Sequence, residues 1–253
     1  MYREHSSFKL PPDDTTIWRY MNLTKYLSML ETESLFFSTP NNLGDPFEGA
    51  ITKEFLSHQD QMFQDRMINV DEKIAEIVDM IGFPNILKEN AKQTFINCWH
   101  INPCESEAMW KLYSNTESGI AVKTDIGSFK SSFICDEDIY IGAIQYTDNN
   151  HDIPVEFERF IERFLFKRTS FEHEKELRAI TRFYDGIDPV DYHKYYNGKY
   201  IKVDISMLIK DVVVYPFAPE WFIDLVKRVT DKYKDIYNFG IVKSNMDIKS
   251  IFN

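Results

Sequence analysis

The stretch 171-FEHEKELRAI-180 joins two glutamates, Glu174 and Glu176, to an apolar run that is typical of a β-strand. On an extended strand, side chains two residues apart project from the same face, so these glutamates and Arg178 are expected to project together. Strand rise places the neighbouring carboxylates roughly 6 to 7 Å apart, close enough for one ligand to contact both. The alternative is a solvated edge face on which Arg178 neutralises its neighbours.

This segment is predicted to form a strand over residues 174–183. Along the rest of the chain, predicted strands and helices follow one another without a strict alternating period. This mixture indicates an α+β fold rather than a doubly wound sheet. Further strands are predicted at residues 16–20, 35–38, 94–100, 119–124, 140–146, 199–204, 211–216 and 239–244, and helices at 23–33, 105–114, 154–168 and 219–233. Apolar residues at helical spacing predict a helical lobe over 52–90, inserted beside the sheet. No linker or repeat marks a boundary, so residues 1–253 are predicted to form a single domain.

Composition restricts the class of protein. The chain has 253 residues and is 43% hydrophobic, which is enough for one large core. It has no apolar run long enough to cross a bilayer and no signal-peptide centre, which predicts a cytoplasmic protein without a membrane partner. Three cysteines, Cys98, Cys104 and Cys135, cannot all pair, so structural disulfides and cysteine-ligated zinc are disfavoured. The formal net charge of -11 argues against general nucleic-acid coating, although a local basic cleft is compatible with it.

Several motifs of common enzyme classes are absent from the sequence, including G-x-x-x-x-G-K-[ST], G-x-G-x-x-G, H-E-x-x-H and G-x-S-x-G. Their absence disfavours P-loop hydrolases, dinucleotide oxidoreductases, zinc proteases and α/β-hydrolases. The six histidines, at positions 5, 58, 100, 151, 173 and 193, are too widely spaced for a recognisable metal pair. No metal site is therefore expected.

The strand-like segment 17-IWRY-20 places a cation in an apolar setting. Arg19 is expected on the strand face opposite Trp18 and Tyr20. A long cation on an inner strand needs an anionic partner, which is either an ion pair within the protein or a charged ligand.

Two other segments are compatible either with a ligand site or with a purely structural role. Met109, Trp110 and Tyr113 form an apolar and aromatic stripe at helical spacing, for which core packing is the usual role. In 44-GDPFEG-49, Asp45 can bond to nearby backbone amides and the following proline fixes the exit direction, which is typical of a rigid corner.

Taken in order, these motifs resemble a bacterial family known as a domain of unknown function, number 2971 (DUF2971). The likeness covers about residues 16 to 183. Its segments are 17-IWRY-20, 35-LFFSTPNNLGDPFEG-49, 106-SEAMWKLYSNTESGIAV-122, 144-IQY-146 and 173-HEKELRAI-180. One departure is Gly44, which stands where the family usually has asparagine. The glycine keeps a turn-permissive residue but removes a side-chain cap.

The order of elements is also similar to that of the mono-ADP-ribosyltransferases, in which a split β-sheet cleft holds NAD. The likeness lies in a first strand with a polar residue, a helix, a strand that ends in serine and a later E-x-E strand start. The helix 108-AMWKLY-113 is also loosely similar to a P-M-L-Y helix of DNA-modifying toxins. By this resemblance Arg19 orients NAD, and Ser38 or Tyr113 lines the nicotinamide pocket.

The same resemblance implies roles for the two glutamates. Cleavage between nicotinamide and ribose builds oxocarbenium-like charge on the sugar, so the last glutamate, Glu176, would stabilise the transition state more than the ground state. Glu174, in the preceding position, would hold or deprotonate the nucleophile. Tyr20, Trp110 or Tyr113 would stack on the nicotinamide ring. NAD is then a substrate, and the scheme requires no metal.

The leading hypothesis is an ADP-ribosyltransferase-like enzyme that uses NAD and modifies an unknown acceptor, a protein or a nucleic acid, as a bacterial toxin or phage-defence effector. A non-catalytic binding module is the alternative from another class. In that case the motifs determine the fold, Glu176 is paired with Arg178 or Arg19, and no open pocket adjoins it. A third hypothesis is an NAD glycohydrolase or nuclease effector, which free ADP-ribose or magnesium dependence would identify.

Overall fold

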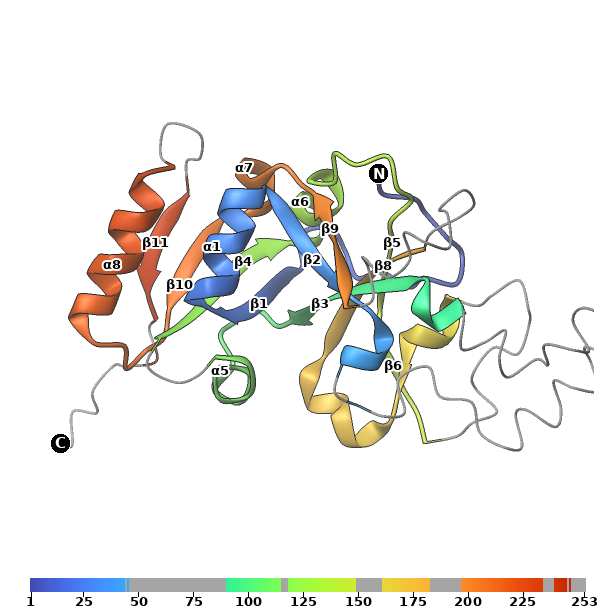
Figure 1. Cartoon of the computed structure of the whole chain (residues 1–253). Helices are drawn as coiled ribbons and strands as arrows, with labels where there is room; N and C mark the ends of the chain where they lie inside the picture. The colour runs from blue at the N-terminus through green and yellow to red at the C-terminus, as the bar shows by residue number, and fades with distance from the viewer. Residues whose placement is uncertain are drawn as a thin grey trace, which may run out of the picture.

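A mixed sheet of nine strands organises the residues that the computed structural model describes, which are 1–43, 45, 90–114, 118–148, 161–182, 197–233, 239–244 and 246 (Figure 1). The strands are β1 (Thr16–Asn22), β2 (Ser34–Ser38), β3 (Thr94–Ile101), β4 (Gly119–Asp125), β5 (Tyr140–Ala143), β8 (Glu176–Arg182), β9 (Gly198–Lys202), β10 (Asp211–Val214) and β11 (Gly240–Lys243). They run in the order β11-β10-β4-β1-β3-β2-β9, and β8 pairs with β3 and β5. All these pairings are antiparallel except that of β10 with β11. The α+β prediction is confirmed.

Helices and one small strand pair connect this sheet within the described residues. The α-helices are α1 (Leu23–Thr32), α5 (Glu107–Tyr113), α6 (Ile126–Ser131), α7 (Ile205–Leu208) and α8 (Glu220–Asp231). Shorter 3-10 helices are η1 (Pro40–Asn42), η5 (Glu162–Leu165) and η6 (Thr169–Glu174). The strands β6 (Gln145–Tyr146) and β7 (Phe166–Lys167) form a separate parallel pair. No helix of the described residues is long and apolar enough to cross a membrane.

The sheet packs a large core on one face and two smaller clusters on the other. In β4, Ile120 and Val122 belong to the large cluster, together with residues of α1 and with Phe222 of α8. The residue between them, Ala121, belongs to a second cluster with Trp110 of α5. Figure 1 shows α5 below the sheet and apart from α1. Period-two alternation along β4 therefore separates the two cores, and each is stabilised by removing apolar surface from water.

The sheet splits along one edge of β3. On its other edge β3 pairs with β8 over Thr94–His100. On the split edge β1 pairs with β3 at Ile17↔Ile101 and Trp18↔His100, whereas β2 pairs with β3 at Ser38↔Ile96. In the described part of the chain, the middle of β3 has no strand partner on this edge. A split sheet was predicted, and the strand register confirms it.

The helix α1 follows β1 directly and lies beside the split. Asn22 ends the strand and caps the helix, because its side-chain oxygen accepts a hydrogen bond from the Lys25 backbone N–H at 3.0 Å. At the other end Glu33 adopts a left-handed conformation (φ 46°, ψ 45°), and its N–H bonds to the Met29 carbonyl. These two caps fix which residues α1 presents to the split.

Most predicted elements match observed ones, with ends that differ by one or two residues. The predicted strand 140–146 is interrupted at Ile144, which separates β5 from β6. The short helices α6 and α7 were not predicted, because each has too few residues to show a clear helical period. The predicted helical lobe over 52–90 lies outside the described residues except for Asn90.

The predicted amphipathic helix over 154–168 is wrong in its described part. Residues 162–165 form the 3-10 helix η5, and the chain then becomes extended in β7. All four residues of η5 are buried, so this segment has no solvated face. An amphipathic surface helix requires such a face, which explains the difference.

Candidate functional site

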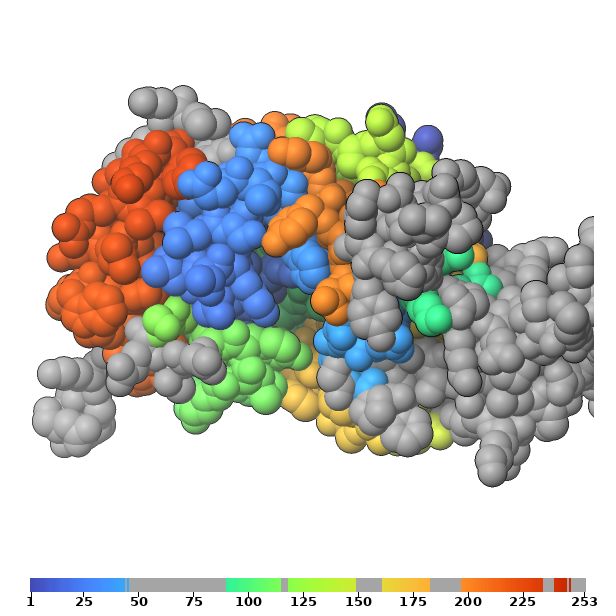
Figure 2. All heavy atoms as spheres, viewed as in Figure 1, coloured from blue at the N-terminus to red at the C-terminus, as the bar shows by residue number. Residues whose placement is uncertain are grey.

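A cavity of about 530 Å³ lies at the split between β1 and β2. In Figure 2 the surface is hollowed between α1 (blue), α5 (green) and β9 (orange). Six of the seven predicted site residues line it, namely Arg19, Tyr20, Ser38, Tyr113, Glu174 and Glu176. These residues come from five separate elements, and the cavity volume falls in the range of small-molecule sites.

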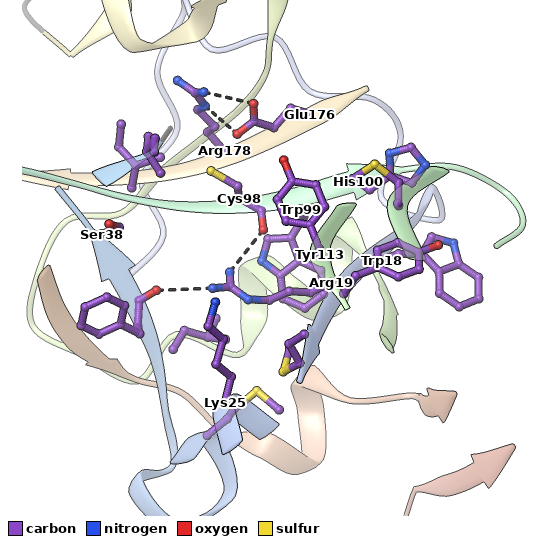
Figure 3. Close-up of a pocket in the computed structure, with 18 of the residues that line it drawn as sticks. Trp18, Arg19, Lys25, Ser38, Cys98, Trp99, His100, Tyr113, Glu176 and Arg178 are labelled. Carbon is purple, nitrogen blue, oxygen red and sulfur yellow. Dashed lines mark hydrogen bonds and ion pairs between the residues drawn. The ribbon is translucent and has the colours of Figure 1, made fainter. Parts of the chain in front are cut away.

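Arg19 fills the split in the sheet. Its guanidinium donates to the Cys98 carbonyl at 3.2 Å and to the Phe36 carbonyl at 3.5 Å (Figure 3). Asn97 also donates to the Phe36 carbonyl, at 2.8 Å. The diverging strands leave these carbonyls without ladder partners, so side chains satisfy them. Burial lowers the pKa of Arg19 to about 10, which leaves it charged at neutral pH.

A second cation lies next to this arginine. Lys25 of α1 lines the cavity, and its side chain points toward Arg19 in Figure 3. Among the described residues, neither cation has a carboxylate partner within 4.0 Å. Two cations that converge without a counter-charge form a favourable site for an anion. The sequence had left open whether Arg19 forms an ion pair, and the described structure contains none.

The two glutamates reach the cavity by a different local structure from the predicted one. Glu174 is the last residue of η6, and Glu176 is the first of β8. Between them Lys175 adopts a left-handed conformation (φ 41°, ψ 55°). The predicted strand start at residue 174 is therefore wrong, because a left-handed residue ends the alternation of an extended chain. Both glutamates nevertheless line the cavity.

Glu176 forms a two-pronged ion pair with Arg178. The arginine donates from Nε to Oε1 at 2.8 Å and from Nη2 to Oε2 at 3.0 Å (Figure 3). Arg178 is fully buried and also donates to the Phe164 carbonyl at 2.7 Å. Burial acts to raise the pKa of Glu176, but the charges and hydrogen bonds of Arg178, together with Lys167, outweigh it and lower the pKa to about 2. Of the two neighbouring glutamates that Arg178 was expected to neutralise, it pairs with Glu176.

Glu174 is held by two other groups. Lys167 of β7 donates to Glu174 Oε2 at 2.5 Å, and the Tyr113 hydroxyl donates to Glu174 Oε1 at 3.1 Å. The same ammonium also contacts Glu176 Oε2 at 3.3 Å. Burial, followed by the charge of Glu174, raises the pKa of Tyr113, which therefore remains a hydrogen-bond donor. A buried lysine thus joins the two carboxylates.

Three predicted residues have other settings. Tyr20 lines the cavity, and its hydroxyl accepts a hydrogen bond from the Ser106 N–H at 2.9 Å. Ser38 lines the cavity and donates to the Thr39 carbonyl at 3.3 Å. Trp110 is not among the lining residues: it is buried, and its ring contacts Tyr20 edge-to-face at 4.9 Å. Trp110 therefore supports the site from the core side.

The remaining residues are Asp45, in the predicted corner, and Lys167 and Lys25, which line the cavity. Asp45 is buried and accepts a hydrogen bond from Arg168 at 2.9 Å, while Gly44 and Pro46 lie outside the described residues. Lys167 was not recognised in the sequence because its segment resembles a helix. Lys25 was missed as well, since an exposed helical lysine is usually a solvated one. Within the described ranges, no cluster of three His, Cys, Asp or Glu side chains could hold a metal ion.

No family model matches this chain, so its resemblance to DUF2971 stays a prediction, and no curated protein matches either. Solved structures of Thermus sp. 2.9 DarT are similar at low identity. The complex with ADP-ribosylated ssDNA is 10% identical, with 96% of this chain and 100% of that chain covered and a TM-score of 0.41. The complex with NAD+ is 8% identical, with 94% and 99% covered and a TM-score of 0.42. Because both TM-scores lie below 0.5, the likeness does not by itself assign a fold family or an activity to this chain.

Proposed function

We propose that this chain binds NAD in the split-sheet cavity and transfers its ADP-ribose to a macromolecular acceptor. One observation carries the proposal. Arg19, Tyr113 and Glu176, which are far apart in sequence, line a single cavity that also holds Glu174. A scaffold has no packing reason to bring a cation and two carboxylates around a void, whereas a dinucleotide site needs such groups.

The cationic end of the cavity suits the pyrophosphate of NAD. Arg19 and Lys25 converge there, and no described carboxylate neutralises them. Guanidinium and ammonium groups form strong, charge-assisted hydrogen bonds with phosphate oxygens. This local charge is compatible with a net charge of -11 because the potential of a cleft depends on the groups that line it.

The carboxylate end suits the ribose next to nicotinamide. When the bond from ribose C1′ to the nicotinamide nitrogen breaks, its electron pair leaves with nicotinamide and positive charge develops on the sugar. Glu176 stays ionised at neutral pH and stabilises that charge, while Arg178 holds its orientation. Glu174 holds the attacking nucleophile and accepts its proton as the new bond to C1′ forms. Tyr113 and Lys167 orient Glu174 for this role.

One feature favours the non-catalytic alternative. A buried ion pair between Glu176 and Arg178 is what that alternative expects, and the structure contains it. An open cavity beside the pair is what it does not expect, and the structure contains this cavity too. The transferase hypothesis expects turnover of NAD, whereas the non-catalytic alternative expects none.

The test is release of nicotinamide and transfer of label from labelled NAD. Glu176→Gln alone leaves Arg178 with a weaker partner, so the informative variant is the pair Glu176→Gln with Arg178→Met, which removes both charges. We expect it to lose about 100-fold or more in rate while it remains folded. Arg19→Met is expected to weaken NAD binding by about 30-fold or more.

The matched control is Glu107→Gln, which breaks the exposed pair with Lys111 and should not change turnover. Equal nicotinamide release by wild type and the double variant would remove Glu176 from the mechanism. No release by the wild type with any acceptor would leave the binding-module alternative. Supplying protein and nucleic-acid acceptors in the same assay identifies the class of acceptor, and release of free ADP-ribose alone indicates a glycohydrolase.

A further inference from the structure

Two exposed aromatic rings stand at the rim of the cavity. Phe36 of β2 and Tyr200 of β9 both line it, with 38% and 51% of their surface exposed. Their ring centroids are 5.2 Å apart, and the rings meet edge-to-face at 62°. Because β9 is the last strand of the described sheet on this side, no described strand covers Tyr200. Exposed aromatic faces beside a cavity are unusual for residues that only pack a core.

The local structure holds these rings in place. The Tyr200 hydroxyl and the Ser28 hydroxyl of α1 are hydrogen-bonded at 3.2 Å. Gly198 lies directly against Phe36, because a Cβ at this glycine would come within 2.4 Å of the phenyl ring. The Phe36 ring therefore lies over backbone that has no side chain. This arrangement is a built surface and not a pair of freely rotating side chains.

The rim adjoins the cationic end of the cavity. Arg19 donates to the backbone carbonyl of Phe36 itself, at 3.5 Å. Lys25 lies three residues before Ser28, which places both on the same side of α1. An aromatic platform next to two cations fits a ligand that carries a planar ring close to a phosphate.

We infer that Phe36 and Tyr200 bind the base of a nucleoside phosphate whose phosphate lies on Arg19 and Lys25. A base stacks on the open face of Tyr200, and Phe36 supports that ring from its edge. In the proposed function this base is the adenine of NAD, since nicotinamide occupies the carboxylate end. The inference rests on the binding half of the proposed function and does not require the transfer chemistry.

The test compares two probes that share a phosphate and differ in the base, AMP and ribose 5-phosphate, by calorimetric titration. We expect the wild type to bind AMP about 5- to 150-fold more tightly, which is the range for stacking of one base on an aromatic side chain. Tyr200→Ala should remove most of this preference and leave the affinity for ribose 5-phosphate unchanged. Tyr200→Phe keeps the ring and should keep the preference, although it loses the hydrogen bond to Ser28.

The control is Trp221→Ala, which removes an exposed aromatic ring on α8 and should change neither affinity. Wild type that does not prefer AMP, or Tyr200→Ala that retains the preference, would overturn the inference. The inference would also be overturned if Tyr200→Ala lowered the affinities for AMP and for ribose 5-phosphate by the same factor. If Tyr200→Ala loses the preference for AMP but the wild type does not turn over NAD, the base site is supported and only the transfer chemistry is contradicted. If Tyr200→Ala turns over NAD like the wild type and keeps the preference for AMP, the transfer chemistry is supported and the base site is contradicted.

Discussion

Lys167 is the residue on which the two carboxylates depend. Its ammonium lies 2.5 Å from Glu174 and 3.3 Å from Glu176, and other groups around the pair are Arg178 and Tyr113. Without this cation two buried carboxylates would face each other across the same space. Like charges at short range raise the pKa of one member of a pair.

Lys167→Met is therefore expected to move the acid limb of the pH dependence of NAD turnover to higher pH and to lower the rate at neutral pH. Lys167→Arg keeps the charge and should restore the wild-type limb. Rates of nicotinamide release measured across pH for the three proteins check this. A Lys167→Met profile that is merely lower at every pH, without a displaced limb, would give Lys167 only a structural role.

At the scale of elements, β9 depends on one glycine. Gly198 has φ +144°, and a Cβ there would lie 2.3 Å from the Phe37 carbonyl oxygen. Gly198→Ala should reduce the free energy of unfolding by more than about 1 kcal/mol, because the side chain is strained in this conformation and must displace its neighbours. The rim ring of Phe36 would shift as well, so AMP binding should weaken.

The matched control is Gly240→Ala in β11, where the nearest atom to a new Cβ is 3.8 Å away. Urea unfolding of both variants gives the comparison. Similar stabilities for the two variants would show that the β9 backbone moves without cost, and the rim would then not be a fixed surface.

At the scale of the whole molecule, the buried charges link global stability to pH. Glu176 has a pKa of about 2 in the folded protein, well below its usual value near 4.5. Protonation therefore favours the unfolded chain. The contribution of this carboxylate, roughly 3 kcal/mol, is fully present above about pH 4.5 and is lost as pH falls toward 2.

Urea unfolding between pH 6 and pH 2 measures this effect. The double variant Glu176→Gln with Arg178→Met lacks the titrating group, so its stability should fall less steeply over this interval than that of the wild type. Parallel curves for the two proteins would contradict the low pKa of Glu176.

Local patterns in the sequence were sufficient for the elements that carry one clear period. The alternation around Arg19 correctly placed it on the face opposite Trp18 and Tyr20, because β1 is a regular strand that pairs with β4 along its whole length. Helical spacing likewise identified α1, α5 and α8. The ordered motifs also identified six residues that now line one cavity.

Local patterns along the chain were therefore sufficient for the α+β class, most strands and the residue types of the candidate site. The partners of these residues depend on how distant segments pack. Arg178 pairs with Glu176 and not with Glu174 because left-handed Lys175 ends the strand alternation, and no local pattern predicts that conformation for a lysine. Lys167 reaches both carboxylates because its segment crosses the core as η5 and β7, where long-range packing overrides a helical period. Periodicity is a property of neighbours along the chain, whereas ion pairs and cavities depend on contacts between distant segments.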